Sequence, residues 1–309
     1  MNNRIPPHLR ERPFFARPVA PGPPAVAPIR WADAVLCSLD CETTGVETRT
    51  DRVWEWGAYW WGGAYHGKGE SRLCNPEQDL PEKLAKKLGV TPELWAQVRE
   101  SRLFSEQVPE FEATMETVRR LEAVIVGWSV AAFDLEILRS ELHRARRACL
   151  AWELWKADHK PTASIDGLPV IDGLALASWW RPDLPSLNLG KVAASLGHAV
   201  PEGLHRTGVD APLALHLTRA LVNSKMPGAT LAAVVRASDE AVRVRAEDRR
   251  VFAGRFSRAH DGTLWCRWGQ AGKRIENVTS PFLMMLLRDR DIPEAGKRRL
   301  RQELEGRGE

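Results

Sequence analysis

Leu39-Asp40-Cys41-Glu42-Thr43-Thr44-Gly45 is the stretch of sequence that decides the fold. It closes an apolar run at 35–40, which predicts a buried strand, and Thr-Thr-Gly is a turn signal. Because a strand alternates its faces, the carboxylates of Asp40 and Glu42 project to one side and Cys41 to the other. Two such carboxylates repel each other unless a cation lies between them, and Mg²⁺ or Mn²⁺ prefers these oxygen ligands. Taken alone, an Asp-x-Glu pair more often reflects only ordinary solvation at a strand end.

Strands and helices alternate around this stretch. Further strands are expected at 52–61, 64–73 and 124–127. Apolar spacing, together with start and stop signals such as Thr91-Pro92-Glu93 and Gly197, predicts helices in 75–100, 109–121, 133–147, 173–180, 187–196 and 210–222. The order of these elements predicts an α/β layered domain.

Composition divides the chain into three parts. Residues 1–30 contain eight prolines and no periodicity, and they predict a disordered Pro/Arg-rich arm of net charge +4. Residues 31–224 form the expected main domain, with a net charge of −6, which ends before Met226-Pro227-Gly228. Residues 225–309, of net charge +6, predict a small basic module with strand-like pieces in 249–267 and two basic helices in 281–304. An acidic centre between basic ends suits a cation site flanked by segments that meet a polyanion, although solvated surface charge gives the same pattern.

Several classes of protein are excluded. The 309 residues contain no apolar run near the ~20 residues that span a bilayer, and no apolar segment typical of a signal peptide follows the N-terminus. The five cysteines are scattered without a CxxC pair, which argues against a disulfide scaffold or a zinc ribbon. We therefore expect a cytoplasmic protein that does not bind membranes.

Three further polar residues occupy informative positions. Asp134 follows Phe133 at the start of a predicted helix, directly after the strand at 124–127. Asp210 opens a later helix, and His205 lies five residues before it in a loop. Taken singly, an acid in a first turn is favoured by the helix dipole, and a lone loop histidine is usually only exposed.

Taken in order, these motifs resemble the DEDDh (DnaQ-like) 3′–5′ exonucleases, and in particular the proofreading epsilon subunit of bacterial DNA polymerase III. The resemblance consists of 39–45 with 52–58, then Phe133-Asp134, then His205-x4-Asp210, and it covers about 33–222. The stretches 170–174 and 187–189 are similar to the family's sequence between the second and third motifs. The resemblance implies a ribonuclease H-like fold, an α/β architecture with a mixed five-stranded sheet flanked by helices.

The resemblance also implies a reaction and the residues that perform it. Asp40, Glu42, Asp134 and Asp210 would hold two divalent metal ions (Mg²⁺ or Mn²⁺), with Asp40 bridging them and Asp134 acting mostly through waters. Such a pair activates a water and stabilises the leaving 3′-oxygen. His205 would be the general base, because its ordinary pKa near 6.5 suits that role. The implied activity is hydrolysis at single-stranded 3′ ends, with release of nucleoside monophosphates and with DNA preferred over RNA.

Substrate-binding residues are predicted in two places. The backbone N–H groups of Thr43, Thr44 and Gly45 would hold the terminal 3′-hydroxyl or phosphate, unless the turn is purely structural. Trp128-Ser129 stands where the family commonly has His-Asn. If the spacing is counted the shorter way, Ser129-Val130 stands there instead. In either case, this departure puts the contact to the terminal nucleotide in doubt. Trp128 would stack on a base or else pack in the core.

Other residues carry structural interpretations. The tryptophans at 54, 56, 60 and 61 are assigned to packing, and Asp172 to a helix cap. The stretches 272–278 and 282–287 resemble a small appendix found after some bacterial exonuclease domains. The basic residues of the last module would grip phosphates or dock a protein; they are Arg243, Arg245, Arg249, Arg250, Lys297, Arg298, Arg299 and Arg301.

Two alternatives to the DNA exonuclease remain open. One is an RNA-processing 3′–5′ exoribonuclease, and the other is a non-catalytic nucleic-acid-binding or polymerase-associated adaptor. The basic ends favour a long polyanion over a dinucleotide. The sequence leaves open whether a polymerase or repair protein is a partner, as roles in DNA replication and DNA repair would require.

Overall fold

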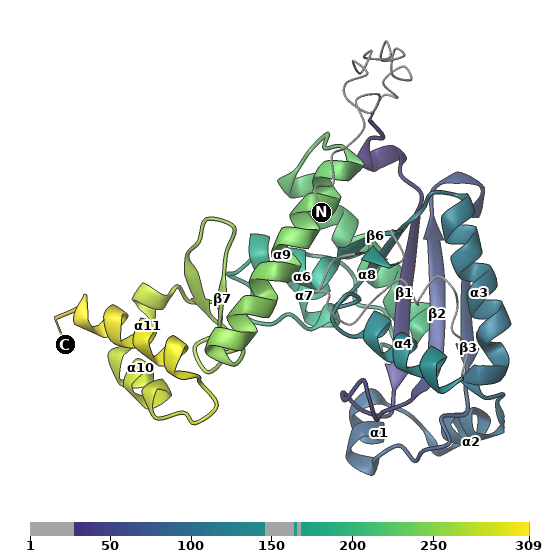
Figure 1. Ribbon diagram of the computed structural model, residues 1–309, viewed down its shortest axis with the longest axis horizontal. Coiled ribbons are helices and arrows are strands. Elements are labelled where there is room, and N and C mark those ends of the chain that lie inside the picture. The colour runs from purple at the N-terminus through teal and green to yellow at the C-terminus, as the bar shows by residue number, and fades with distance from the viewer. Residues whose placement is uncertain (1–27, 146–163, 166–167, 309) are drawn as a thin grey trace, which may run out of the picture.

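A mixed β-sheet forms the centre of the molecule in the computed structural model, which describes residues 28–145, 164–165 and 168–308 (Figure 1). The strands lie in the order β3-β2-β1-β4-β6-β5, with β2 antiparallel to β1 and β3, and β4 parallel to β1 and β6. Their bounds are β1 Leu36–Thr43, β2 Val53–Trp61, β3 Gly69–Leu73, β4 Val124–Gly127, β5 Ser164–Ile165 and β6 Leu168–Asp172. The predicted mixed five-stranded sheet of the ribonuclease H-like fold is confirmed, and the two-residue β5 extends it at one edge.

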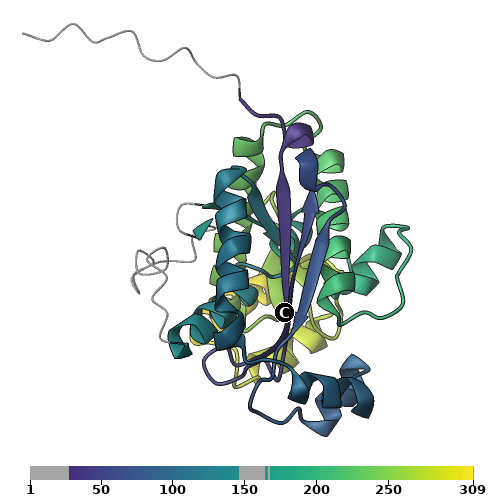
Figure 2. The ribbon, with the colours of Figure 1, turned by 90° about the vertical axis from the view of Figure 1, so that its right-hand side faces the viewer.

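Helices cover both faces of the sheet (Figure 2). One layer contains α3 (Phe104–Arg120) and α4 (Asp134–Arg144), and the other contains α6 (Gly173–Trp180), α8 (Thr207–Lys225) and α9 (Leu231–Phe252). Along β1, Cys37, Leu39 and Cys41 belong to the first core and Leu36 to the second. The alternation expected for β1 is therefore present, and it places Asp40 and Glu42 on the face opposite Cys41.

Two helices begin earlier than the sequence pattern predicts. We expected α3 from 109 and α8 from 210, but each contains a proline after its first turn, Pro109 and Pro212. A proline lacks the backbone N–H, which a helix tolerates best in its first turn, so the sequence pattern predicts a helix start near the proline. In α3, burial of Phe104 and Val108 stabilises the turn that precedes the proline.

The remaining short elements agree with the prediction more closely. The region 75–100 contains α1 (Glu82–Leu88) and α2 (Pro92–Glu100), and the hydroxyl of Thr91 caps α2 by accepting from the Leu94 N–H at 3.2 Å. The helix expected at 187–196 is α7 (Leu189–Ser195), followed by Gly197 at φ +78°. The strand expected at 64–73 is wrong in its first half, which forms a short 3₁₀ helix and a turn before β3.

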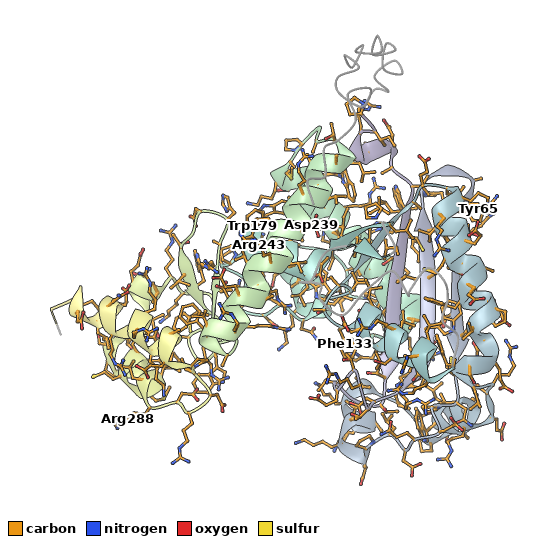
Figure 3. The ribbon with its side chains drawn as sticks, viewed as in Figure 1. Tyr65, Phe133, Trp179, Asp239, Arg243 and Arg288 are labelled. Carbon is orange, nitrogen blue, oxygen red and sulfur yellow. The ribbon has the colours of Figure 1, made fainter. Side chains whose placement is uncertain are left out.

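The C-terminal region differs from the prediction in two respects. Residues 249–252 belong to the long helix α9, which was missed, and only β7 (Phe256–Arg258) and β8 (Leu264–Cys266) follow as a hairpin. Of the two helices expected to be basic, α10 (Ser280–Leu287) has no basic residue, and α11 (Glu294–Glu305) carries the charges. Arg288, exposed after α10, points away from the rest of the molecule (Figure 3).

Helix α9 connects the two predicted domains. It packs on α6 and β6 of the main domain and on β7 of the C-terminal hairpin. The backbone near its start also holds the beginning of the described chain, since the N–H of Leu231 donates to the carbonyl of Ile29 at 2.8 Å. The boundary at 224/225 stays a prediction, and the predicted arm lies outside the described residues except for 28–30.

Two expectations concerning composition can be compared with the described residues. None of the helices in this part of the chain is long and apolar enough to cross a membrane. Cys37, Cys41, Cys74 and Cys266 are free thiols, and Cys149 lies outside the described residues.

Candidate metal and catalytic site

The carboxylates of Asp40 and Glu42 lie at the C-terminal end of β1. They stand opposite Gly57 and Glu55 of β2 in the antiparallel ladder. Glu42 is 7% exposed, so its carboxylate is largely withdrawn from water. The structure thus brings two acidic side chains onto one side of a central strand, as the alternation of β1 requires.

Asp134 meets β1 from the start of α4. Its Oδ1 accepts a hydrogen bond of 2.9 Å from the backbone N–H of Cys41, the residue between the two strand carboxylates. The chain reaches this point through a tight turn after β4, in which the N–H groups of Ala132 and Phe133 both donate to the Ser129 carbonyl at 3.0 Å. Figure 3 marks Phe133 at this end of the sheet.

Asp210 and His205 come from α8 and the loop before it. The backbone N–H of His205 donates to Asp210 Oδ2 at 3.2 Å, which ties the loop to the first turn of the helix. His205 has φ +68°, a left-handed conformation that is uncommon for residues other than glycine. Ligand atoms of His205, Asp210 and Glu42 all lie within 4.8 Å of one another. The third motif therefore folds onto the first.

Burial and mutual repulsion raise the pKa values of the carboxyl groups. The pKa of Asp40 is well above its usual range because the group is buried and because Asp134, Glu42 and Asp210 surround it. The pKa of Glu42 is raised by burial and then by Asp210. Burial raises the pKa of Asp134 to about 8 and that of Asp210 to about 6. Without a cation, this arrangement favours protonated carboxyl groups near neutral pH.

The donor set fits a hard divalent cation. Within the part of the chain that the structure describes, Asp40 Oδ2 and Asp210 Oδ1 are buried and have no hydrogen-bond partner. Orphaned anionic oxygens of this kind are costly, and a metal ion satisfies them without a proton. A neutral imidazole beside them is compatible with either of two tasks, binding a metal or accepting a proton.

Sequence reasoning missed the pair of Glu55 and Arg206, which supports the loop. Glu55 is fully buried, and its carboxylate accepts from Arg206 Nε and Nη2 at 2.9 Å each. The same carboxylate accepts from the backbone N–H of Thr207 at 3.2 Å and from Ser71 Oγ at 2.5 Å. A glutamate between two tryptophans in a strand signals a buried charge that needs a partner, but its identity follows only from the fold.

The turn after β1 is tightly bonded within itself. The N–H of Thr44 donates to the Arg52 carbonyl and its hydroxyl accepts from the Arg52 N–H, both at 2.9 Å. The hydroxyl of Thr43 donates to the Gly45 carbonyl at 2.6 Å. At Gly45, a Cβ would lie 2.2 Å from Asp51 Oδ2, so a side chain there would displace Asp51. The Thr44 N–H is thus occupied by the turn in this structure, and substrate contacts by Thr43, Thr44 and Gly45 stay predictions.

Trp128 packs between two parts of the domain. Its indole Nε1–H donates to the Leu187 carbonyl at 2.9 Å, and its ring faces Gly173, where a Cβ would lie 3.0 Å from it. Ser129 adopts φ +73° and turns the chain toward α4. Both residues therefore have a structural role, and base stacking by Trp128 remains a prediction.

The structural interpretations of Asp172 and three tryptophans are confirmed. Asp172 Oδ1 accepts from the Ala175 N–H at 2.8 Å, so it caps α6. Trp54, Trp56 and Trp60 are buried in the core. Trp61 is half-buried, and the guanidinium carbon of Arg219 lies over its ring, 3.8 Å from the ring centroid.

Comparison with known proteins gives structural neighbours only. No family model matches the sequence, and no curated protein matches it significantly. A product-bound structure of exonuclease I aligns with a TM-score of 0.46 and 18% identity over 69% of this chain and 47% of the other. The apo structure of exonuclease I gives 0.45 and 19%, over 69% and 45%. E. coli exonuclease I in complex with a dT13 oligonucleotide gives 0.45 and 19%, over 63% and 42%. This chain spans less than half the length of those exonuclease I chains.

Proposed function

We propose that this protein is a metal-dependent 3′–5′ exonuclease that hydrolyses phosphodiester bonds at single-stranded DNA ends. One observation carries the proposal: Asp40, Glu42, Asp134 and Asp210 come from three separate elements, yet the last three all lie close enough to Asp40 to raise its pKa, and Glu42 and Asp210 lie beside His205. The packing of an α/β fold does not require four carboxylates in one place, and their mutual repulsion opposes folding. The resemblance to the DEDDh exonucleases is carried by these same positions.

The four carboxylates would hold divalent cations. Bound Mg²⁺ or Mn²⁺ would supply Lewis-acid activation of a water and of the leaving 3′-oxygen. Asp40, with its orphaned Oδ2, is the proposed shared ligand, and Asp210 offers its orphaned Oδ1. Asp134 has one oxygen committed to the Cys41 N–H, which leaves its other oxygen for a contact of its own.

His205 is the proposed general base. Burial, followed by the positive charge of Lys87, lowers its pKa below the ordinary value. The ring is therefore neutral at pH 7, and one of its nitrogens can accept the proton of the attacking water. The hydrogen bond from the backbone N–H of His205 to Asp210 Oδ2 ties the loop that carries the ring to the first turn of α8.

A direct assay tests the function. Single-stranded DNA and RNA of the same sequence, labelled at the 5′ end, are incubated with the protein in Mg²⁺, Mn²⁺ or EDTA. The proposal expects a ladder that shortens from the 3′ end, disappears in EDTA and is absent for Asp40→Asn. Glu240→Gln, an exposed carboxylate paired with Arg243, is the matched control and should retain activity. Equal cleavage by Asp40→Asn, or binding of both strands without cleavage, would overturn the proposal and favour the adaptor.

A further inference from the structure

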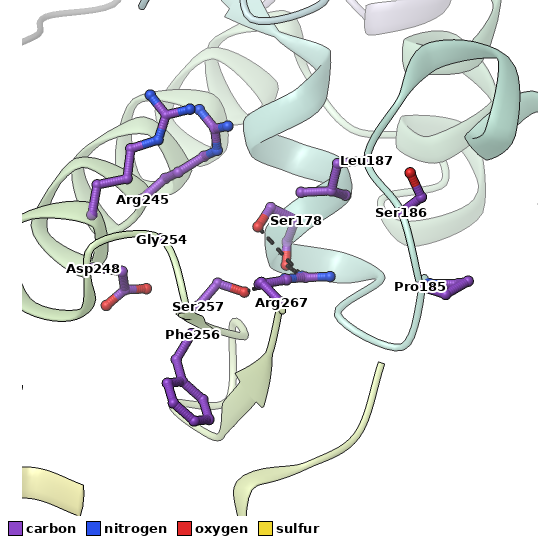
Figure 4. Close-up of a pocket in the computed structure, with 11 residues that line it drawn as sticks. Ser178, Pro185, Ser186, Leu187, Arg245, Asp248, Gly254, Phe256, Ser257 and Arg267 are labelled. Atoms are coloured by element: carbon purple, nitrogen blue, oxygen red, sulfur yellow. Dashed lines mark hydrogen bonds between the residues drawn. The ribbon is translucent and has the colours of Figure 1, made fainter. Parts of the chain in front are cut away.

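A second charged site lies apart from the carboxylates, between α9, the β7–β8 hairpin and the segment before α7 (Figure 4). It is a pocket of about 290 Å³, near the small end of the range of about 300–1,000 Å³ for ligand pockets. Arg245, Arg249 and Arg267 line it together with the hydroxyl-bearing residues Ser178, Ser186 and Ser257.

Arg267 is built into the wall of this pocket. Its Nε donates to Ser257 Oγ at 2.6 Å, and its two terminal nitrogens donate to the carbonyls of Leu184 and Ser178 at 3.1 and 3.0 Å. All of these acceptors are neutral, so they fix the guanidinium without cancelling its charge. Burial lowers the pKa of Arg267 to about 10, which still leaves it charged at neutral pH.

Arg245 and Arg249 extend from one face of α9, four residues apart. No ion pair joins either of them to a carboxylate among the described residues, although Asp172 attracts Arg245 from a greater distance. Burial and repulsion by Arg249 lower the pKa of Arg245 to about 10. Arg249 is exposed, so the pocket is open to solvent on that side.

The acidic residue in the pocket wall does not neutralise the arginines. Both oxygens of Asp248 are held by Arg258, Oδ1 by the Nε at 2.7 Å and Oδ2 by the backbone N–H at 2.6 Å. The pocket therefore collects three guanidinium groups with hydroxyl donors and no free counter-charge. Arginine forks and hydroxyls together are the usual recognition chemistry for phosphate.

We propose that Arg245, Arg249 and Arg267 form a binding site for a phosphate group. The pocket is linked to the end of β4, because Leu187 lines it and the Leu187 carbonyl accepts from the indole N–H of Trp128. The phosphate comes either from the backbone of a single strand or from a free phosphorylated compound. The strand source rests on the proposed function, whereas the free source does not.

The test uses the full chain in EDTA, so that catalysis plays no part. Two probes are applied: inorganic phosphate in a thermal-shift assay, against NaCl of equal ionic strength, and a fluorescein-labelled oligo-dT in an anisotropy titration over a range of salt. Wild type is compared with Arg245→Gln/Arg249→Gln. Arg243→Gln is the control, because it removes one positive charge from α9 at an exposed residue that is paired with Glu240. Arg249→Lys keeps the charge and should retain binding.

Each result has a defined meaning. Loss of the phosphate-induced shift in the double variant, with normal melting in NaCl, supports the site. If the phosphate belongs to the strand, oligo-dT binding in the double variant should also weaken about tenfold, which is the value of one charge-assisted hydrogen bond. The slope of log affinity against log salt concentration should then fall in magnitude by about 0.7, as expected for one lost phosphate contact. If strand binding is unchanged, the phosphate belongs to a free compound. A double variant that matches wild type with both probes overturns the site, whether or not the protein is a nuclease.

Discussion

The carboxylate site at the end of β1 and the arginine pocket beside α9 both gather like charges, but they differ in how those charges can be relieved. Burial and repulsion raise the pKa of Asp134 to about 8 and that of Asp210 to about 6, so these groups can shed charge by binding protons near neutral pH. Arg245 and Arg267, with pKa values lowered only to about 10, remain charged there. The carboxylate site can therefore exist with protons or with metal, whereas the arginine pocket is neutralised at pH 7 only by an anion.

The largest expected effect is at the carboxylate site. Asp40→Asn removes a carboxylate that Asp134, Glu42 and Asp210 repel and should lower the proposed exonuclease activity by about 10³-fold or more, since metal binding would supply several kcal/mol of charge stabilisation. Single-turnover cleavage of labelled DNA measures this. The same variant should retain the phosphate-induced thermal shift. If that shift is lost as well, the two sites are not independent.

His205→Asn should lower the rate of cleavage by about 10²-fold or more, because the proposed general base is removed. The lowered pKa of His205 predicts that the acidic limb of the wild-type pH–rate profile lies below the ordinary histidine value. Rates at saturating Mg²⁺ across pH would show this limb. Its persistence in His205→Asn would assign the base to another group.

Glu55→Gln tests the buried pair that supports the loop. Because Glu55 is fully buried and the Arg206 side chain is 38% exposed, we expect a loss of about 2–3 kcal/mol in the free energy of unfolding, less than for a fully buried pair. Urea denaturation measures it. The matched control Glu240→Gln breaks an exposed pair and should cost about 1 kcal/mol or less. Equal losses in the two variants would mean that the buried pair contributes no more than a surface pair.

A further expected effect is a pH dependence confined to the carboxylate site. The folded-state pKa values of Asp40, Glu42, Asp134 and Asp210 lie above the unfolded value of about 4, so the folded state binds more protons between about pH 4 and pH 8. In EDTA, the free energy of unfolding should fall as pH rises through this window, and His205, with its lowered pKa, opposes the trend below about pH 6.5.

Thermal melts in EDTA across this range measure that dependence, and Mg²⁺ or Mn²⁺ should remove it at the alkaline end. Asp134→Asn should flatten the profile. Arg245→Gln/Arg249→Gln should leave its shape unchanged, because those residues line the arginine pocket and not the carboxylate site. A profile that is flat in the wild type would contradict the raised pKa values.

The mixed sheet was implied by the resemblance to the DEDDh exonucleases, whereas the sequence by itself determined the α/β layering and the motifs of the carboxylate site. Short-range rules are sufficient for these: strand alternation places Asp40 and Glu42 together, and helix starts place Asp134 and Asp210 in first turns. The same rules misplaced the starts of α3 and α8. A proline is typical of the first turn of a helix, but long-range burial decides whether another turn precedes it.

Only the tertiary structure decided which charges meet. Arg206 pairs with Glu55 across 151 residues, and Arg267 reaches Ser178 across 89. Among the basic residues singled out in the last module, the fold separates Arg243, paired with Glu240 at the surface, from Arg245 and Arg249 at the pocket. Local propensity says nothing about such partners, because the cost of a buried or crowded charge depends on what the folded chain places beside it.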